Sequence, residues 1–233
     1  MSGALQTRDR TNVWRSRIGG APLGRRFALR RIRDNSLLTS SPSISDQKAQ
    51  LRAEALARRD ALRAQMRAEA AEAIGARGLP FPLKPGAIVS GFMAMKSEIN
   101  PLPLMRKLAQ GGARLALPAI KGRGHPLIMR AYAFGDELAR GQWGIREPKS
   151  EAAEVAPDIL LVPLAAFDRT GQRIGYGAGY YDMTIHALRA GKEIVAVGLA
   201  FAAQEISHVP ATPRDERLDF VLTEREVIDF RGL

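Results

Sequence analysis

A nearly unbroken apolar run, DILLVPLAAFD at residues 158–168, constrains the fold of this chain more than any other feature. A strand with such a sequence is covered on both of its faces, as happens in parallel sheets that lie between two layers of helices. A second run of the same kind, EIVAVGLAF, lies at 193–201, and helix-like segments alternate with the strand-like ones. This order predicts an α/β domain with three layers, αβα, and a mostly parallel central sheet.

The other expected elements complete this pattern. A helix rich in Ala, Arg, Leu and Glu begins at Ser45 or Asp46, either of which can cap it, and ends at Gly75 or Gly78. The further segments that we expect to form strands are 87–95, 113–120, 126–134 and 219–224. The further helices are expected within 96–112, where prolines start the helix and glycines stop it, and at 183–191.

The first 44 residues differ in composition from the rest of the chain. They hold nine arginines and two aspartates, so +7 of the net charge of +11 lies there, and they have no helical or alternating pattern. We expect a disordered basic tail at 1–44, followed by a single domain at 45–233. The tail can be a targeting presequence, a plain disordered tail or an over-extended translation start, and we favour the last two. Because the charge lies in the tail and not in the body, it argues against nucleic-acid binding as the main function.

Composition also excludes several kinds of site. The chain has no cysteine, which excludes disulfides, thiolate nucleophiles and cysteine-based zinc sites. Its three histidines lie far apart, and no pair has the spacing of a metal site. No apolar run reaches the roughly eighteen residues of a membrane span, so we expect no contact with a membrane. We expect a cytoplasmic protein that is a monomer.

The stretch RIGYGAGYYD at 173–182 has three glycines at alternate positions. Its spacing excludes the G-x-G-x-x-G dinucleotide fingerprint and the phosphate-binding P-loop. A loop with unobstructed N–H groups that leads into a helix start at Met183 can instead hold a phosphate, and Arg173 adds a positive charge. Asp182 then suits Mg²⁺ shared with phosphate oxygens. The alternative is a glycine-rich surface loop in which Asp182 caps the helix.

Three basic residues lie on one face of the first expected helix. Lys48, Arg52 and Arg59 are separated by four and seven positions, which places them on the same side. On spacing alone, a solvated basic stripe is the simpler interpretation.

The run VPLAAFDRTGQRIGYGAGYYD at 162–182 resembles the signature of the 5-formyltetrahydrofolate cyclo-ligases, also called methenyltetrahydrofolate synthetases. Four further segments resemble motifs of the same family in the same order: KAQLR at 48–52, SEIN at 97–100, WGIREP at 143–148 and the closing segment 198–224. Together they extend from about residue 46 to the C-terminus.

The resemblance implies an ATP- and Mg²⁺-dependent conversion of 5-formyltetrahydrofolate, a reduced folate, to 5,10-methenyltetrahydrofolate. ATP phosphorylates the formyl oxygen, the second nitrogen of the folate closes the ring, and phosphate leaves. An enzyme of this kind chiefly aligns two substrates and neutralises phosphate charge. It needs no cysteine or serine nucleophile and no redox cofactor, which agrees with the absence of cysteine.

The resemblance also implies roles for individual residues. Arg173 and Tyr180 are implied to be catalytic, and Asp182 to hold Mg²⁺. The implied ATP-binding residues are Lys48, Ala49, Gln50, Leu51, Arg52, Arg173, Ile174, Gly175, Tyr176, Gly177, Ala178, Gly179, Tyr180 and Tyr181. The implied folate-binding residues are Met93, Glu98, Tyr176, Gly177, Ala178, Gly179 and Tyr180. Trp143 and Phe92 can be further walls of the folate site or part of the core.

Two residues depart from the family pattern. Met183 stands where the family commonly has Arg, and Asn100 where Asp is frequent. Two other functions remain open at this point: an ATP-dependent paralogue of the same fold with another substrate, and an RNA-binding protein that acts through its basic tail.

Overall fold

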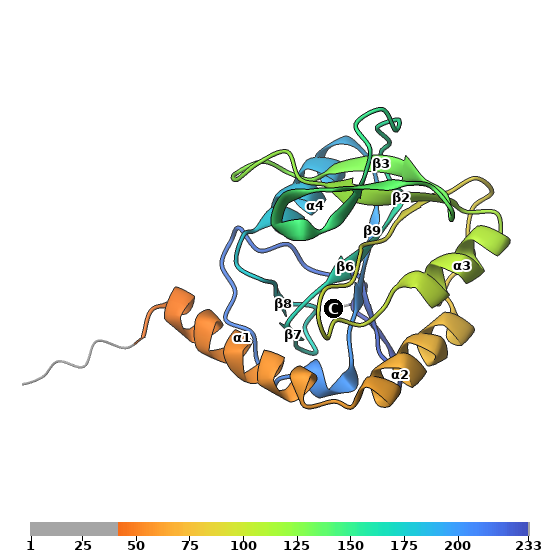
Figure 1. Cartoon of the computed structure of the whole chain (residues 1–233). Helices are drawn as coiled ribbons and strands as arrows, with labels where there is room; N and C mark the ends of the chain where they lie inside the picture. The colour runs from red at the N-terminus through yellow and green to blue at the C-terminus, as the bar shows by residue number, and fades with distance from the viewer. Residues whose placement is uncertain (1–41, 233) are drawn as a thin grey trace, which may run out of the picture. The chain divides into compact units, whose positions relative to one another are not determined.

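The computed structural model describes residues 42–232 (Figure 1). The expected basic tail falls almost entirely on residues 1–41, outside the described residues, and stays a prediction. A seven-stranded sheet forms the centre of the described part, in the order β11-β10-β9-β6-β1-β2-β3. Its strands are β1 (Ile88–Ser90), β2 (Arg114–Ala119), β3 (Ile128–Tyr132), β6 (Ile159–Pro163), β9 (Val195–Leu199), β10 (Phe220–Leu222) and β11 (Val227–Asp229). The five inner strands are parallel, and only β3 and β11 at the edges run antiparallel. The predicted α/β fold with a mostly parallel sheet is confirmed.

Both faces of the sheet are buried, as the apolar runs predict. Along β6, Leu161 belongs to one core cluster, whereas its neighbours Leu160 and Val162 belong to a second cluster. The helices α2 (Ala64–Arg77) and α3 (Leu102–Gln110) pack together against the first cluster, and α4 (Tyr180–Gly191) covers the second through Ile185. The sheet therefore lies between two helical layers.

The first expected helix is in fact two helices. The N-cap is Ser43, which forms a capping box with Asp46, so α1 (Ile44–Asp60) begins before the expected residue. The helix stops at Asp60, and α2 follows from Ala64 with Gly78 at its end, one of the two expected stops. No Pro or Gly marks this break, so a local pattern does not reveal it. Packing explains it, because α1 lies against β7 and the 3₁₀ turn η2 (Ala202–Gln204), whereas α2 packs on α3.

Several strand boundaries also differ from those expected. The apolar run 158–168 divides after Pro163, and its end, β7 (Ala166–Phe167), pairs with β8 (Arg173–Ile174) in a small separate hairpin. The run 87–95 forms a strand only at 88–90. A second hairpin, β4 (Leu138–Arg140) with β5 (Arg146–Pro148), was not expected, because strands of three residues show too short an alternation to recognise.

The order of the strands reverses direction between β1 and β6. The chain passes from β1 through α3 to β2 on one side, and from β6 through α4 to β9 on the other. Ligands of open α/β sheets bind at such a reversal, outside the carboxyl ends of the strands. In the described residues no helix is long and apolar enough to cross a membrane.

Candidate functional site

A cavity of about 140 Å³ lies at this reversal of strand order. Most of its walls come from three parts of the chain: the segment after β1, the β4–β5 hairpin and the glycine-rich loop with the start of α4. Pro118, Ile120, Leu127 and Pro163 complete the lining. Six of the seven predicted folate residues line it, Gly177 being the exception: Met93, Glu98, Tyr176, Ala178, Gly179 and Tyr180. Cavities that enclose whole drug-sized ligands measure about 300–1,000 Å³, so this one fits only a ring-sized part of a ligand.

The glycine-rich loop presents free backbone N–H groups beside the cavity. In the described part of the chain, none of the N–H groups of residues 176–179 donates to a protein acceptor. Gly177 and Gly179 have positive φ angles of 97° and 69°, which glycine adopts without strain. The helix α4 begins at Tyr180, three residues before the expected start, so its unpaired first N–H groups continue those of the loop. This arrangement is suited to an anion.

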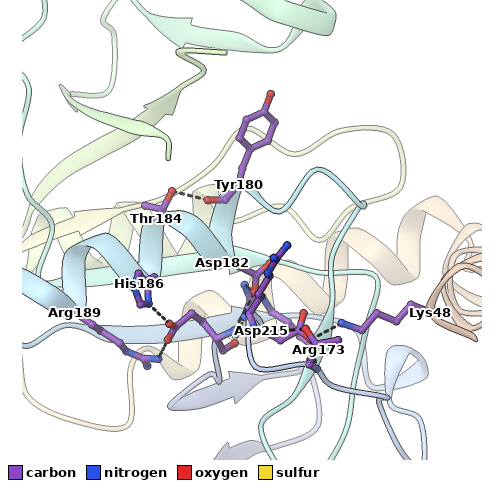
Figure 2. A network of polar contacts seen from close by, with 11 residues as sticks. Lys48, Arg173, Tyr180, Asp182, Thr184, His186, Arg189 and Asp215 are labelled. Carbon is purple, nitrogen blue, oxygen red and sulfur yellow. Dashed lines mark hydrogen bonds and ion pairs between the residues drawn. The ribbon is translucent and has the colours of Figure 1, made fainter. Parts of the chain in front are cut away.

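Arg173 and Asp182 lie together at the base of this loop (Figure 2). The buried guanidinium of Arg173 donates from Nη2 to Asp182 Oδ1 at 2.7 Å and from Nη1 to the carbonyl of Glu216. Burial lowers the pKa of Arg173, against the opposing charges of Asp182, Asp215 and Glu216. Gly179, and not Asp182, is the N-cap of α4, so the interpretation of Asp182 as a helix cap is wrong.

The basic face of α1 is turned toward the protein. Lys48 Nζ donates to Asp215 Oδ2 at 2.6 Å, and Arg52 Nε donates to the carbonyl of Gly175 at 2.7 Å. Arg59, 3% exposed, donates to the hydroxyl of Tyr176 at 2.5 Å. The interpretation of Lys48, Arg52 and Arg59 as a solvated basic stripe is therefore wrong.

The other three residues of the predicted ATP-binding segment do not reach the loop. Ala49 and Gln50 are exposed, and Leu51 packs on a small apolar cluster that includes Ile174. Two partners of the basic face could not be found from local patterns. Asp215 lies 167 residues from Lys48 in the sequence, and Ser97, which accepts from Arg59 Nε at 3.0 Å, lies 38 residues away from it.

Glu98 lines the cavity beside Tyr176. Its Oε2 accepts the N–H of Met95 at 2.8 Å. Burial raises the pKa of Glu98, while Tyr176, Met95 and Arg59 oppose the rise. The pKa of Tyr176 is raised by burial and by the nearby charge of Glu98. A carboxylate in this setting can pair with N–H donors of a ligand that replaces water.

Two buried polar atoms of the cavity have no hydrogen-bond partner. In residues 42–232 only three buried side-chain atoms lack one, and two of them, Tyr180 OH and Glu147 Oε1, belong to residues that line this cavity. Buried polar groups without a partner are uncommon, and a ligand is one explanation for them. Trp143 is 61% exposed, and its ring lies 5.9 Å from that of Tyr180, whereas Phe92 is buried and serves both as wall and as core.

The carboxylates near the loop fit a magnesium site that is completed by a ligand. Among the described residues no group of three or more His, Cys, Asp or Glu side chains could hold a metal. Asp182 Oδ1 is bound by Arg173 and by the N–H of Glu216, while Oδ2 forms no hydrogen bond within 42–232. Magnesium is commonly bound by one or two carboxylates together with phosphate oxygens, so a single free oxygen beside a phosphate loop fits it.

Asp168 and Asn100 have structural roles, whereas Met183 lies outside the cavity. Asp168 is fully buried, and its two oxygens accept the N–H groups of Thr170 and Val209, each at 2.8 Å, so it orients the start of the loop. Asn100 accepts the N–H of Leu102 at the start of α3. Met183 does not line the cavity, so the structure shows no replacement there for the arginine of the family pattern.

Comparisons with known proteins agree with this geometry. A sequence model of the 5-formyltetrahydrofolate cyclo-ligase family matches residues 44–224. The 5-formyltetrahydrofolate cyclo-ligase of Mycolicibacterium smegmatis is 34% identical over 190 residues, covering 78% of this chain and 95% of that protein. The enzyme of the same name from Escherichia coli is 31% identical over 180 residues, covering 73% and 96%. The solved 5,10-methenyltetrahydrofolate synthetase of Aquifex aeolicus aligns with a TM-score of 0.66 at 28% identity, covering 79% of this chain and 93% of that one.

Proposed function

Because this chain belongs to the 5-formyltetrahydrofolate cyclo-ligase family and has the activity of that family, we propose that the cavity between β1 and β6 is where its two substrates meet. One observation supports this proposal above all. The free N–H groups of the loop lie beside a cavity in which polar atoms of Tyr180 and Glu147 have no hydrogen-bond partner. The loop suits a phosphate, and the cavity suits a ring with hydrogen-bonding edges.

The family implies the use of ATP, and we place its phosphates over residues 174–181. Backbone N–H groups of the loop, the start of α4 and the charge of Arg173 would neutralise the triphosphate. Lys48 and Arg52 lie close enough to exchange Asp215 and the Gly175 carbonyl for phosphate oxygens. The predicted segment Lys48–Arg52 would thus contribute its two cations, while Ala49, Gln50 and Leu51 hold the helix in place.

We place the pterin end of the reduced folate in the cavity. Glu98 would accept its adjacent N–H donors, and Met93, Tyr176 and Tyr180 would contact its rings. The cavity is ring-sized, so the rest of the folate would lie outside it. The formyl oxygen then faces the glycine loop, where phosphoryl transfer from ATP makes it a leaving group and the second nitrogen closes the ring.

We assign Mg²⁺ to the free oxygen of Asp182. When bound, the ion would neutralise charge on the phosphates and orient them. Arg173 keeps the Asp182 carboxylate in place through the 2.7 Å hydrogen bond. We further propose that the protein acts in the cytoplasm as a monomer; no feature of the described residues favours the RNA-binding or paralogue alternatives.

A near-ultraviolet absorbance assay tests this function. Purified protein with 5-formyltetrahydrofolate and Mg-ATP should produce the absorbance of the methenyl product, and omission of ATP should abolish it. Tyr180→Phe should lower kcat, whereas Tyr132→Phe on β3, outside the cavity, should leave it unchanged. If no product forms at every magnesium concentration and pH tested, the result would contradict the proposed function.

Removal of residues 1–41 separates the body from the tail. The truncated protein keeps Ser43, which caps α1, and should retain full activity. RNA affinity that survives this truncation would favour the RNA-binding alternative.

A further inference from the structure

Glu147 is a buried acidic residue to which neither the motifs nor the function assigned a role. It lies on β5 in the unexpected hairpin, is 9% exposed and lines the cavity. Its Oε1 has no hydrogen-bond partner. The backbone of Gly141 lies directly against the carboxyl group, because a Cβ at Gly141 would be 2.2 Å from the Glu147 Cδ. The chain therefore makes room for this carboxyl group by having glycine at 141.

The other acidic groups of the cavity are already engaged. Glu98 accepts the N–H of Met95 and lies near the charge of Arg59, and Asp182 is paired with Arg173. No histidine lines the cavity. Glu147 is thus the one acidic group of the cavity that has both a free oxygen and no counter-charge.

The cyclisation releases a proton that must be taken up. The second nitrogen of the folate is nitrogen 10, and its lone pair forms a bond to the activated formyl carbon. The bond from that carbon to the phosphorylated oxygen then breaks, and phosphate leaves with the electron pair. Nitrogen 10 carries a hydrogen before this step and none in the methenyl product. The N–H electron pair remains on nitrogen and the proton leaves to an acceptor.

We propose that the carboxylate of Glu147 accepts the proton from nitrogen 10 and later releases it to solvent. This inference rests on the proposed function. A positioned general base contributes about 10²- to 10⁴-fold to the rate of such a step. Its carboxylate form is regenerated when product leaves and water re-enters.

The surroundings of Glu147 raise its pKa, which makes its carboxylate a stronger base than an exposed one. Burial raises the pKa above the ordinary value, and the backbone N–H of Ile120 opposes the rise. The titratable groups that share its cavity are Glu98, Arg173, Tyr176, Tyr180, Tyr181 and Asp182. Charged side chains also lie on the elements packed around Glu147. Arg140 and Arg146 of its own hairpin and Arg114 of β2 are exposed, and Arg130 of β3 is paired with Glu154. None of these is among the groups that shift its pKa.

The pH profile of turnover tests the inference. Only the carboxylate accepts a proton, so kcat of the wild type should fall as pH decreases through the raised pKa of Glu147. Glu147→Gln should lower kcat by about 10²-fold or more. This variant should also lose the acidic limb, that is, the fall of kcat at low pH, while its KM for folate changes less than threefold. Glu147→Asp should retain the limb with a smaller loss of kcat. Glu137→Gln, an exposed acid beside the same hairpin, serves as the control and should match the wild type.

The outcomes separate this inference from the proposed function. A wild type that forms no methenyl product overturns both. A wild type that turns over without an acidic limb overturns the role of Glu147 whatever its variants do. Glu147→Gln with unchanged kcat and limb, or with only a higher KM, shows a structural or binding role instead. Thermal melting and ATP binding of each variant confirm that it is folded.

Discussion

The guanidinium of Arg173 and the carboxylate of Asp182 neutralise each other across 2.7 Å, nine residues apart in the chain. The arginine is almost fully buried, and the aspartate is 27% exposed. The implied catalytic cation and the implied metal ligand are therefore one unit, held at the start of α4. A substitution of either residue changes the charge of the other's environment.

Asp182→Asn should abolish turnover while leaving folate binding largely intact, because the proposed metal oxygen is lost and the cavity is not. It also leaves Arg173 buried without its counter-charge, which we expect to lower the free energy of unfolding by about 3 kcal/mol. Urea denaturation and folate binding by calorimetry measure the two effects. Retained turnover would contradict the metal role of Asp182.

Lys48→Met should raise the KM for ATP more than tenfold with a smaller effect on the KM for folate, because Lys48 lies on the phosphate side of the site. Its partner Asp215 has a lowered pKa, through Lys48 and Thr212, despite burial. A lowered carboxyl pKa stabilises the fold above the unfolded value near 3.8 and ceases to do so as pH falls through the folded value.

The wild type should thus be more stable than Lys48→Met at pH 7, by about 1 kcal/mol, and the difference should shrink as pH falls below 3.8 and vanish below the folded pKa of Asp215. Denaturation at both pH values checks this. An equal difference at pH 7 and pH 3 would show that the ion pair is not its source.

Glycine substitutions in the loop should differ by position. Gly177 has a φ of 97°, so Gly177→Ala costs about 1–2 kcal/mol of strain and should raise the KM for ATP. Gly175 does not have a positive φ, and a Cβ there meets no atom within 4 Å. Gly175→Ala is therefore the matched control for stability and should melt within about one degree of the wild type. Equal melting temperatures for the two variants would contradict the strained backbone at Gly177.

Glu98→Gln should stabilise the folded protein at neutral pH while weakening folate binding. The raised pKa of Glu98 means that the folded state disfavours the charged carboxylate. The resulting loss of folding stability grows as pH rises through the folded pKa. The amide removes this loss and can still accept the N–H of Met95. Melting at pH 6 and pH 8, together with the KM for folate, measures both effects. A variant that is less stable than the wild type at pH 8 would contradict the direction of the shift.

The sheet could be predicted because its signal is local. The run 159–167 is apolar at every position, and neighbouring residues of its strand divide between two core clusters as a doubly covered strand requires. The break between α1 and α2 could not be predicted, since it follows from what each helix packs on and not from any breaker residue. The motif residues of the site came from a resemblance, and the structure brings most of them to one cavity.

Glu147 and Asp215 both lie in segments that resemble the family, yet the resemblance gave neither of them a role. Glu147 lies in WGIREP, one of the matching segments, yet only its burial and its free oxygen single it out. Asp215 becomes recognisable only when the fold brings it to Lys48. A local sequence pattern identifies the residues of a motif. Contacts between distant parts of the chain identify the residues that position those motif residues.

The basic face of α1 has one more consequence. Lys48 reaches Asp215 and Arg52 reaches the Gly175 carbonyl in the glycine-rich loop, while Arg59 reaches Tyr176 and Ser97 on the side of the proposed folate site. Lys48 and Arg59 lie eleven positions apart on one continuous helix, a rise of about 16 Å. With the substrates placed as proposed, the number of residues between Lys48 and Arg59 therefore sets the distance between the ATP and folate sites. One inserted alanine within that interval would rotate the two ends by about 100° relative to each other and uncouple them, although every contacting side chain would still be present.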